Sequence, residues 1–234
     1  MKASALFFIY LRVMIWIIFI FLTLASLLVQ NTLKSRFAKY SKIRLGSGMT
    51  GAQVAQKMLY DNGIYDVSVV AAKGSLTDHY DPTRKTIALS EDVYNTCSIA
   101  AAAVAAHETG HAVQHATAYA PLRMRSALVP VVNFASMTVQ WVILAGMIFI
   151  NVFPDLLWIG IALFAVTTLF SLITLPVEIN ASTRAISWLT DSGIADFETR
   201  PMAIDALKWA AYTYFIAAIS SLATLLYYIG IARR

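Results

Sequence analysis

Four long apolar runs decide what this chain of 234 residues can fold into. They extend over residues 6–29, 127–153, 156–175 and 209–231, and each reaches the roughly 20 residues that a helix needs to cross a bilayer. Inside a bilayer the backbone polar groups of a segment must pair with one another, so the runs are expected to be helices. The sequence therefore predicts a multi-pass membrane protein with about four transmembrane helices.

The composition supports a bilayer rather than an oversized soluble core. Hydrophobic residues make up 59% of the chain and charged residues 13%, whereas soluble domains average about 25% charged residues. The net charge of +5 comes without a patch of interleaved basic and aromatic residues, so no nucleic-acid partner is expected. Cys97 is the only cysteine, which leaves histidines and carboxylates as the ligands for any metal.

Basic residues orient the four spans. Five of them follow the first span directly: Lys34, Arg36, Lys39, Lys42 and Arg44. Arg123 and Arg125 precede the second span, and the turn between the second and third spans has neither Lys nor Arg. By the positive-inside tendency, the segments between these spans that carry the charges are predicted to lie on the cytoplasmic side of the cell membrane.

This topology divides the chain into five segments. They are an N-terminal transmembrane anchor (1–30), a cytoplasmic domain (31–125), a transmembrane hairpin (126–175), a second cytoplasmic segment (176–208) and a C-terminal transmembrane helix (209–234). Residues 66–72, 76–80 and 85–89 of the cytoplasmic domain predict short strands. So small a sheet needs a partner surface, and the alanine-rich helix predicted from about Ser90 to Ala118, with a break near Asn95, would provide it.

The alanine-rich helix contains a metal-binding motif, His107-Glu108-Thr109-Gly110-His111. Residues four apart lie on one helix face with their Cβ atoms about 5–6 Å apart, so both imidazoles can bind one zinc ion at about 2 Å. The Glu of this HExxH pattern can reach a metal-bound water as general base. The motif therefore predicts one Zn²⁺ per chain, held by His107 and His111, with Glu108 as the catalytic residue.

Two histidines leave a zinc site short of a ligand, and a His2Glu set would keep a fourth position for water. The third ligand has to lie on the cytoplasmic side near the membrane, where Glu178 follows the third span. Glu178 is therefore predicted to bind the metal, the alternative being a surface carboxylate paired with Arg184. His115 lies eight residues after His107, about 12 Å along a helix, so it is not expected to be a ligand.

Four strings occur in order along the chain: Ser47-Gly-Met-Thr-Gly-Ala, Leu76-Thr-Asp-His-Tyr-Asp-Pro, Ala105-Ala-His-Glu-Thr-Gly-His-Ala-Val-Gln-His and Leu175-Pro-Val-Glu-Ile-Asn-Ala-Ser-Thr-Arg-Ala. In these strings the chain resembles the YugP-like family of membrane zinc metallopeptidases. The resemblance covers residues from about 40 to 190 and implies a zinc-dependent membrane peptidase with Glu178 as the third ligand. The fold expected from the apolar runs and the short strands is mainly α, with about four transmembrane helices and a small α+β metallopeptidase-like domain on the cytoplasmic side.

The chain is also similar to membrane metallopeptidases that join an HExxH helix to a Glu on a later helix. In some of them an acidic residue follows that Glu by four positions, where this sequence has Ser182. The surroundings of the ligands must therefore differ here, and Asn180 is a candidate member of them.

Together these features predict a zinc metalloendopeptidase of the gluzincin type, in contact with the lipid bilayer and acting on a protein or peptide substrate, for which membrane association is one option. Glu108 would take a proton from zinc-activated water and deliver it to the leaving amine. His79, Tyr80 and Arg184 are open alternatives for stabilising the developing oxyanion or binding substrate.

Two other classes of function are alternatives to the peptidase. A catalytically silent membrane scaffold or sensor would hold a structural zinc in a closed site, with His79 or His115 as the fourth ligand. A zinc transporter would place ionisable residues within its spans, and the second, third and fourth apolar runs contain none.

Overall fold

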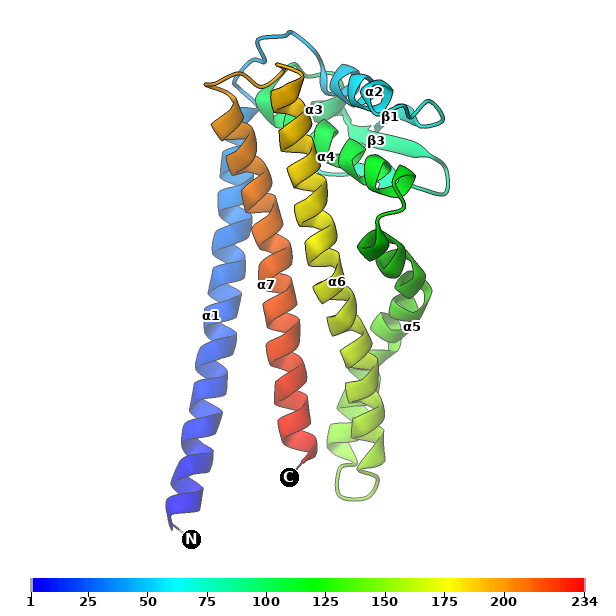
Figure 1. Cartoon of the computed structure of the whole chain (residues 1–234). Coiled ribbons are helices and arrows are strands. Elements are labelled where there is room, and N and C mark those ends of the chain that lie inside the picture. The colour runs from blue at the N-terminus through cyan, green and yellow to red at the C-terminus, as the bar shows by residue number, and fades with distance from the viewer. Residues whose placement is uncertain (1, 234) are drawn as a thin grey trace. The chain divides into compact units, whose positions relative to one another are not determined.

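Long helices make up most of the protein in the computed structural model, which describes residues 2–233 and the side chains of residues 14–233 (Figure 1). The long helices are α1 (Lys2–Tyr40), α5 (Ala120–Ile148), α6 (Asp155–Asp191) and α7 (Arg200–Ala232). Within the described residues these four are long and apolar enough to cross a membrane. The prediction of a mainly α membrane protein with about four spans is confirmed.

Short elements fill the chain between α1 and α5. They are α2 (Gly51–Asp61), β1 (Ser68–Ala72), β2 (His79–Asp81), β3 (Thr86–Ser90), α3 (Glu91–Tyr94) and α4 (Ile99–Ala116). The strands form one sheet in the order β1-β3-β2, with β1 parallel and β2 antiparallel to the central strand β3. The small α+β part that the sequence predicts is therefore present.

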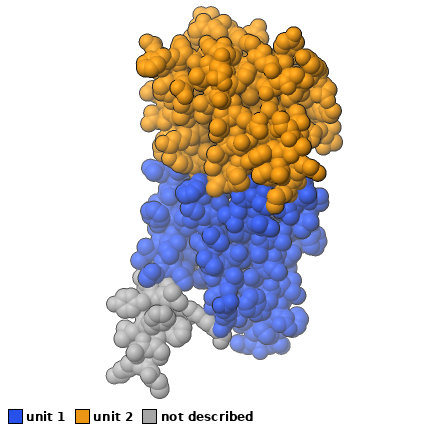
Figure 2. Space-filling view, viewed as in Figure 1, with its two compact units in different colours: residues 1–29, 125–174, 213–234 blue, residues 30–124, 175–212 orange. Residues whose placement is uncertain are grey.

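The chain divides into two compact units, which Figure 2 colours separately. The first, here called the span unit, consists of residues 1–29, 125–174 and 213–234. The second, here called the site unit, consists of residues 30–124 and 175–212. The boundaries fall inside the long helices, so each of these helices contributes residues to both units. The five-segment division remains a prediction.

The core of the site unit forms around α4. Its alanines Ala101, Ala102, Ala105 and Ala106 are buried, together with Met58 of α2 and Ile87 and Leu89 of β3. Small side chains let neighbouring elements approach closely, and α2, β2 and β3 all pack on α4. The predicted packing of the sheet on the HExxH helix is confirmed.

Caps explain where α2 and α4 begin. Thr50 and Gln53 form a capping box, with nitrogen–oxygen distances of 2.9 and 3.3 Å. The Ser98 hydroxyl accepts a hydrogen bond from the backbone N–H of Ala101 at 3.2 Å and starts α4. The alanine-rich helix is thus broken after α3, which Asn95 terminates, as the sequence predicts.

The ends of several elements differ from the prediction: β1 begins at Ser68 rather than at residue 66, and β3 covers Thr86–Ser90 rather than 85–89. The second strand begins at His79 rather than at residue 76, because Leu76 has φ 60, a left-handed conformation that extended chain excludes. The helix of the third apolar run extends beyond that run, because α6 contains Pro176 and continues to Asp191. The functional consequence is that Glu178 lies on the same helix as the third apolar run.

Candidate metal centre

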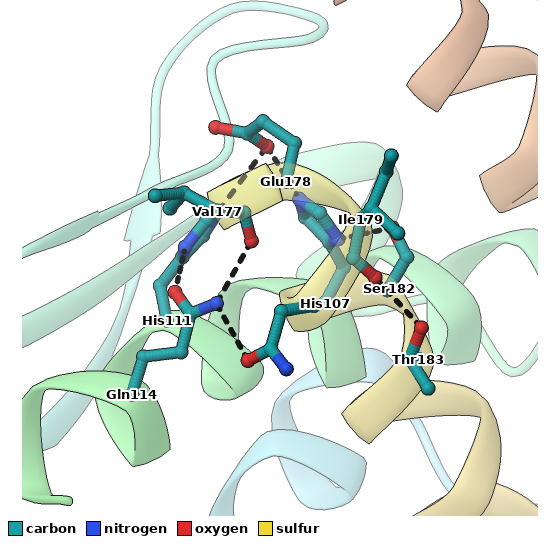
Figure 3. Close-up of polar contacts among 9 residues, drawn as sticks. His107, His111, Gln114, Val177, Glu178, Ile179, Ser182 and Thr183 are labelled. Atoms are coloured by element: carbon teal, nitrogen blue, oxygen red, sulfur yellow. Dashed lines mark hydrogen bonds and ion pairs between the residues drawn. The ribbon is translucent and has the colours of Figure 1, made fainter. Parts of the chain in front are cut away.

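Two histidines of α4 and one glutamate of α6 converge at the candidate site (Figure 3). The four-residue spacing places the rings of His107 and His111 on one face of α4, with centroids 4.8 Å apart. The Nε2 atoms of these rings lie 3.3 and 3.4 Å from the same carboxylate oxygen, Oε2 of Glu178. One ligand atom from each residue lies within 4.8 Å of the others, so the three side chains could hold one ion.

The donor set fits zinc. It consists of two imidazole nitrogens and one carboxylate oxygen, and three such protein ligands leave the open fourth position that is typical of catalytic zinc sites. Glu178 is only 3% exposed, and a buried carboxylate is costly unless it is paired or coordinates a metal. The chemistry of the donors and the burial of the acid therefore both suit a divalent cation.

A close approach of α4 and α6 holds the acid beside the histidines. Gly110 lies between the two histidines in sequence, and a Cβ built on it would be 2.7 Å from the carbonyl oxygen of Ala181. Ala181 is fully buried, three residues after Glu178 on α6. The two small residues let the helix backbones meet where the metal-binding side chains are attached.

Each histidine has a polar partner at its second ring nitrogen. Nδ1 of His107 lies 3.1 Å from the hydroxyl of Ser182, and Nδ1 of His111 lies 3.1 Å from Oε1 of Gln114. Partners at this position commonly orient metal-binding imidazoles. Sequence reasoning missed Gln114, although it follows His111 by three residues and such pairs are neighbours on a helix. For Ser182 the sequence indicates only that an acidic residue is absent at this position, and not that the hydroxyl contacts His107.

Asn180 and Arg184 are linked to His111 through Gln114. The side-chain oxygen of Asn180 accepts hydrogen bonds from Nε2 of Gln114 at 3.0 Å and from Nε of Arg184 at 2.8 Å. The structure thus joins two of the predicted site residues, Asn180 and Arg184, in one network with Gln114. The guanidinium of Arg184 is directed to Asn180, whereas the carboxylate of Glu178 faces the histidines.

His79 and Tyr80 lie on β2, and their polar contacts are with Thr77 and His115. Nδ1 of His79 is 2.8 Å from the carbonyl oxygen of Thr77, and the hydroxyl of Tyr80 is 3.1 Å from Nδ1 of His115. The second contact ties β2 to the end of α4. The roles predicted for these residues in substrate binding stay predictions.

The electrostatics of His111 reflect its acidic neighbours. Burial lowers the pKa of this imidazole, but the hydrogen bond to Glu178 and the negative charges of Glu178 and Glu108 outweigh burial, so that the pKa is raised above its ordinary value. Metal binding requires the neutral imidazole, so protons compete with a metal ion at this residue.

Comparison with known proteins places the chain in a family. The family described as "Putative neutral zinc metallopeptidase" matches residues 15–233. The protein named "Putative membrane protease YugP" from Bacillus subtilis (strain 168) is 45% identical over 218 residues, which cover 92% of this chain and 96% of that protein. No solved structure matches the chain. The resemblance inferred from the four sequence strings is confirmed, and the chain belongs to the family described as "Putative neutral zinc metallopeptidase".

Proposed function

We propose that the protein is a zinc-dependent membrane metalloendopeptidase of the gluzincin type, with one Zn²⁺ per chain held by His107, His111 and Glu178. The observation that carries the proposal is the approach of both Nε2 atoms to one buried carboxylate oxygen, at 3.3 and 3.4 Å. Membership of a zinc metallopeptidase family supports zinc over other divalent ions.

When bound, zinc acts as a Lewis acid toward the scissile carbonyl and makes an attacking water more acidic. Glu108 is the proposed general base, which takes the proton of the attacking water and passes it to the leaving amine. It follows His107 directly in α4 and is partly exposed, so water can reach it. It also precedes His111 by three residues on the same helix, a spacing that makes side chains neighbours.

Three residues remain candidates for stabilising the oxyanion: His79, Tyr80 and Arg184. Burial and then the charges of Asp66 and Asp81 raise the pKa of Tyr80 above its ordinary value. Its phenol therefore keeps the proton at neutral pH and can donate a hydrogen bond. Arg184 donates to Asn180 through Nε, and its guanidinium carries further N–H groups.

We propose that the site faces the cytoplasm and acts on a protein or peptide substrate at the membrane surface. The support is the run of basic residues that follows the first span, of which Lys34, Lys39, Lys42 and Arg44 are exposed. Residues 125–174 belong to the span unit. Glu178 follows Thr174, the last of these residues, by four positions, which is about 6 Å along a helix.

The test is the zinc content of detergent-purified protein. Wild type should carry about one zinc per chain, and Glu178→Ala should lose most of it because a two-histidine site lacks the third ligand. Glu198→Ala, which removes an exposed carboxylate of the site unit, is the control and should keep its zinc. Zinc retained by Glu178→Ala would favour another ligand and the closed, structural site of a membrane scaffold.

A further inference from the structure

Gln114 is a fully buried amide, with none of its surface exposed, three residues after His111 on α4. A buried primary amide needs partners for its N–H donors and for its carbonyl oxygen. Nε2 donates to the backbone carbonyl of Val177 at 2.8 Å and to the side-chain oxygen of Asn180 at 3.0 Å. The oxygen, Oε1, lies 3.1 Å from Nδ1 of His111 (Figure 3).

Arg184 and the backbone carbonyl of Val177 fix which atoms of this network donate and which accept hydrogen bonds. The guanidinium of Arg184 can only donate, so the atom of Asn180 that faces it must be the oxygen. The backbone carbonyl of Val177 can only accept. Both atoms therefore demand the nitrogen of Gln114, and its oxygen is left to face His111.

The orientation of Gln114 in turn decides the tautomer of neutral His111. An amide oxygen can only accept, so Nδ1 of His111 must carry the proton. The lone pair then lies on Nε2, the atom 3.4 Å from the carboxylate of Glu178. A lone pair facing a carboxylate oxygen is unfavourable by itself and suits a cation bound between them.

The same amide also anchors the turn of α6 that carries the acid. Val177 and Asn180 lie on either side of Glu178 in sequence, and Nε2 of Gln114 bonds to both. One side chain of α4 thus fixes the imidazole of one ligand and the backbone that bears another.

We propose that Gln114 is a positioning residue of the metal centre, which locks His111 in the Nδ1–H tautomer and holds the Glu178 turn against α4. This inference rests on the proposed function, since it assigns Gln114 a purpose only if His111 and Glu178 bind metal. His107 differs, because its partner Ser182 has a hydroxyl that can donate or accept and does not impose a tautomer.

The first measurement is 15N NMR of histidine-labelled, metal-free wild type, with His111 assigned by its loss in His111→Gln. At a pH where His111 is neutral, we expect the Nδ1–H form. Gln114→Met, which keeps the volume and removes the hydrogen bonds, should lose this preference. Gln114→Glu, which keeps an acceptor toward Nδ1, should restore it. An Nε2–H tautomer in wild type overturns the inference without any variant.

The second measurement is zinc affinity by competition with a chelator, together with the unfolding temperature of the metal-free protein. Gln114→Met should bind zinc about 10–100-fold more weakly, as is typical when a ligand's partner is lost. Thr109→Val is the matched control, since Thr109 is fully buried on α4 and its hydroxyl bonds to the carbonyl of Ala105. It should change zinc affinity far less, even if both variants unfold at a similar temperature.

The outcomes separate the two proposals. If wild type binds zinc through Glu178 and Gln114→Met binds it as tightly as Thr109→Val does, the positioning role is wrong and the metal centre stands. If wild type binds no zinc, the proposed function fails and the role of Gln114 fails with it.

Discussion

Gly110 of α4 lies so close to Ala181 of α6 that a Cβ on the glycine would be 2.7 Å from the alanine carbonyl oxygen. The neighbour is backbone rather than a flexible side chain, so it cannot rotate away. The contact lies between the two histidines on one helix and three residues beyond Glu178 on the other. The distance between the helices here decides whether the three candidate ligands reach one ion.

Gly110→Ala should therefore damage the metal centre more than its small volume suggests. We expect zinc affinity to fall about tenfold or more and stability to fall by about 1–3 kcal/mol, as in other overpacked cores. The affinity can be measured with a competing chelator and the stability by thermal unfolding.

Gly146→Ala is the matched control for this variant. A Cβ there would lie 2.6 Å from Cα of Leu157, another backbone contact between helices, but within the span unit. It should lower the unfolding temperature and leave zinc affinity unchanged. Equal zinc affinity in Gly110→Ala and wild type would show that the helix spacing does not control the site.

Glu108→Gln should separate metal binding from hydrolysis. The amide keeps the size of the side chain but cannot accept a proton, so cleavage of labelled casein should fall by about 10²–10⁴-fold, the usual contribution of a general base. Zinc content should stay at the wild-type level, because Glu108 is not among the three converging ligands. Substantial turnover by this variant would remove Glu108 from its proposed role.

Ser182→Ala should weaken zinc binding less than the loss of Gln114 does. The variant removes the partner of Nδ1 of His107, which lies 3.1 Å away, but leaves the Glu178 turn anchored by Gln114. We expect a decrease toward the lower end of the ~10–100-fold range for such partners. Thr183→Ala, which removes an exposed hydroxyl one residue on, is the control. A larger loss in Thr183→Ala than in Ser182→Ala would contradict the assignment.

The sidedness of the site can be measured by cysteine labelling in a Cys97→Ser background. Asn151→Cys lies exposed in the turn between α5 and α6, and Glu198→Cys lies exposed between α6 and α7. With a cytoplasmic site, an impermeant maleimide should label only Asn151→Cys in intact cells and both variants after the membrane is opened. Labelling of Glu198→Cys alone in intact cells would place the site outside.

Local sequence patterns predict much of this fold. The length of the apolar runs predicts the four long helices. The spacing within α4 predicts that the rings of His107 and His111 share a face, as they do. These features depend on residues within one or two helical turns, which sequence patterns describe well.

Features that depend on how distant helices pack could not be predicted in the same way. Ser182 meets His107 across a separation of 75 residues, and Gln114 meets Val177 across 63. A single glutamine or serine belongs to no sequence pattern that predicts contacts with residues so far away in the chain.

The order of the helices has a consequence for biosynthesis. His111 leaves the ribosome 67 residues ahead of Glu178 (178 − 111), and α5 and the apolar part of α6 lie between them. With Glu178 as the proposed third ligand, the nascent chain exposes two histidines but cannot complete the centre until both intervening helices have been synthesised and delivered to the bilayer. A hydrolytic centre arranged in this way is completed only after two intervening helices have been made, and a shorter nascent chain is spared from acting as a peptidase on the proteins that surround it.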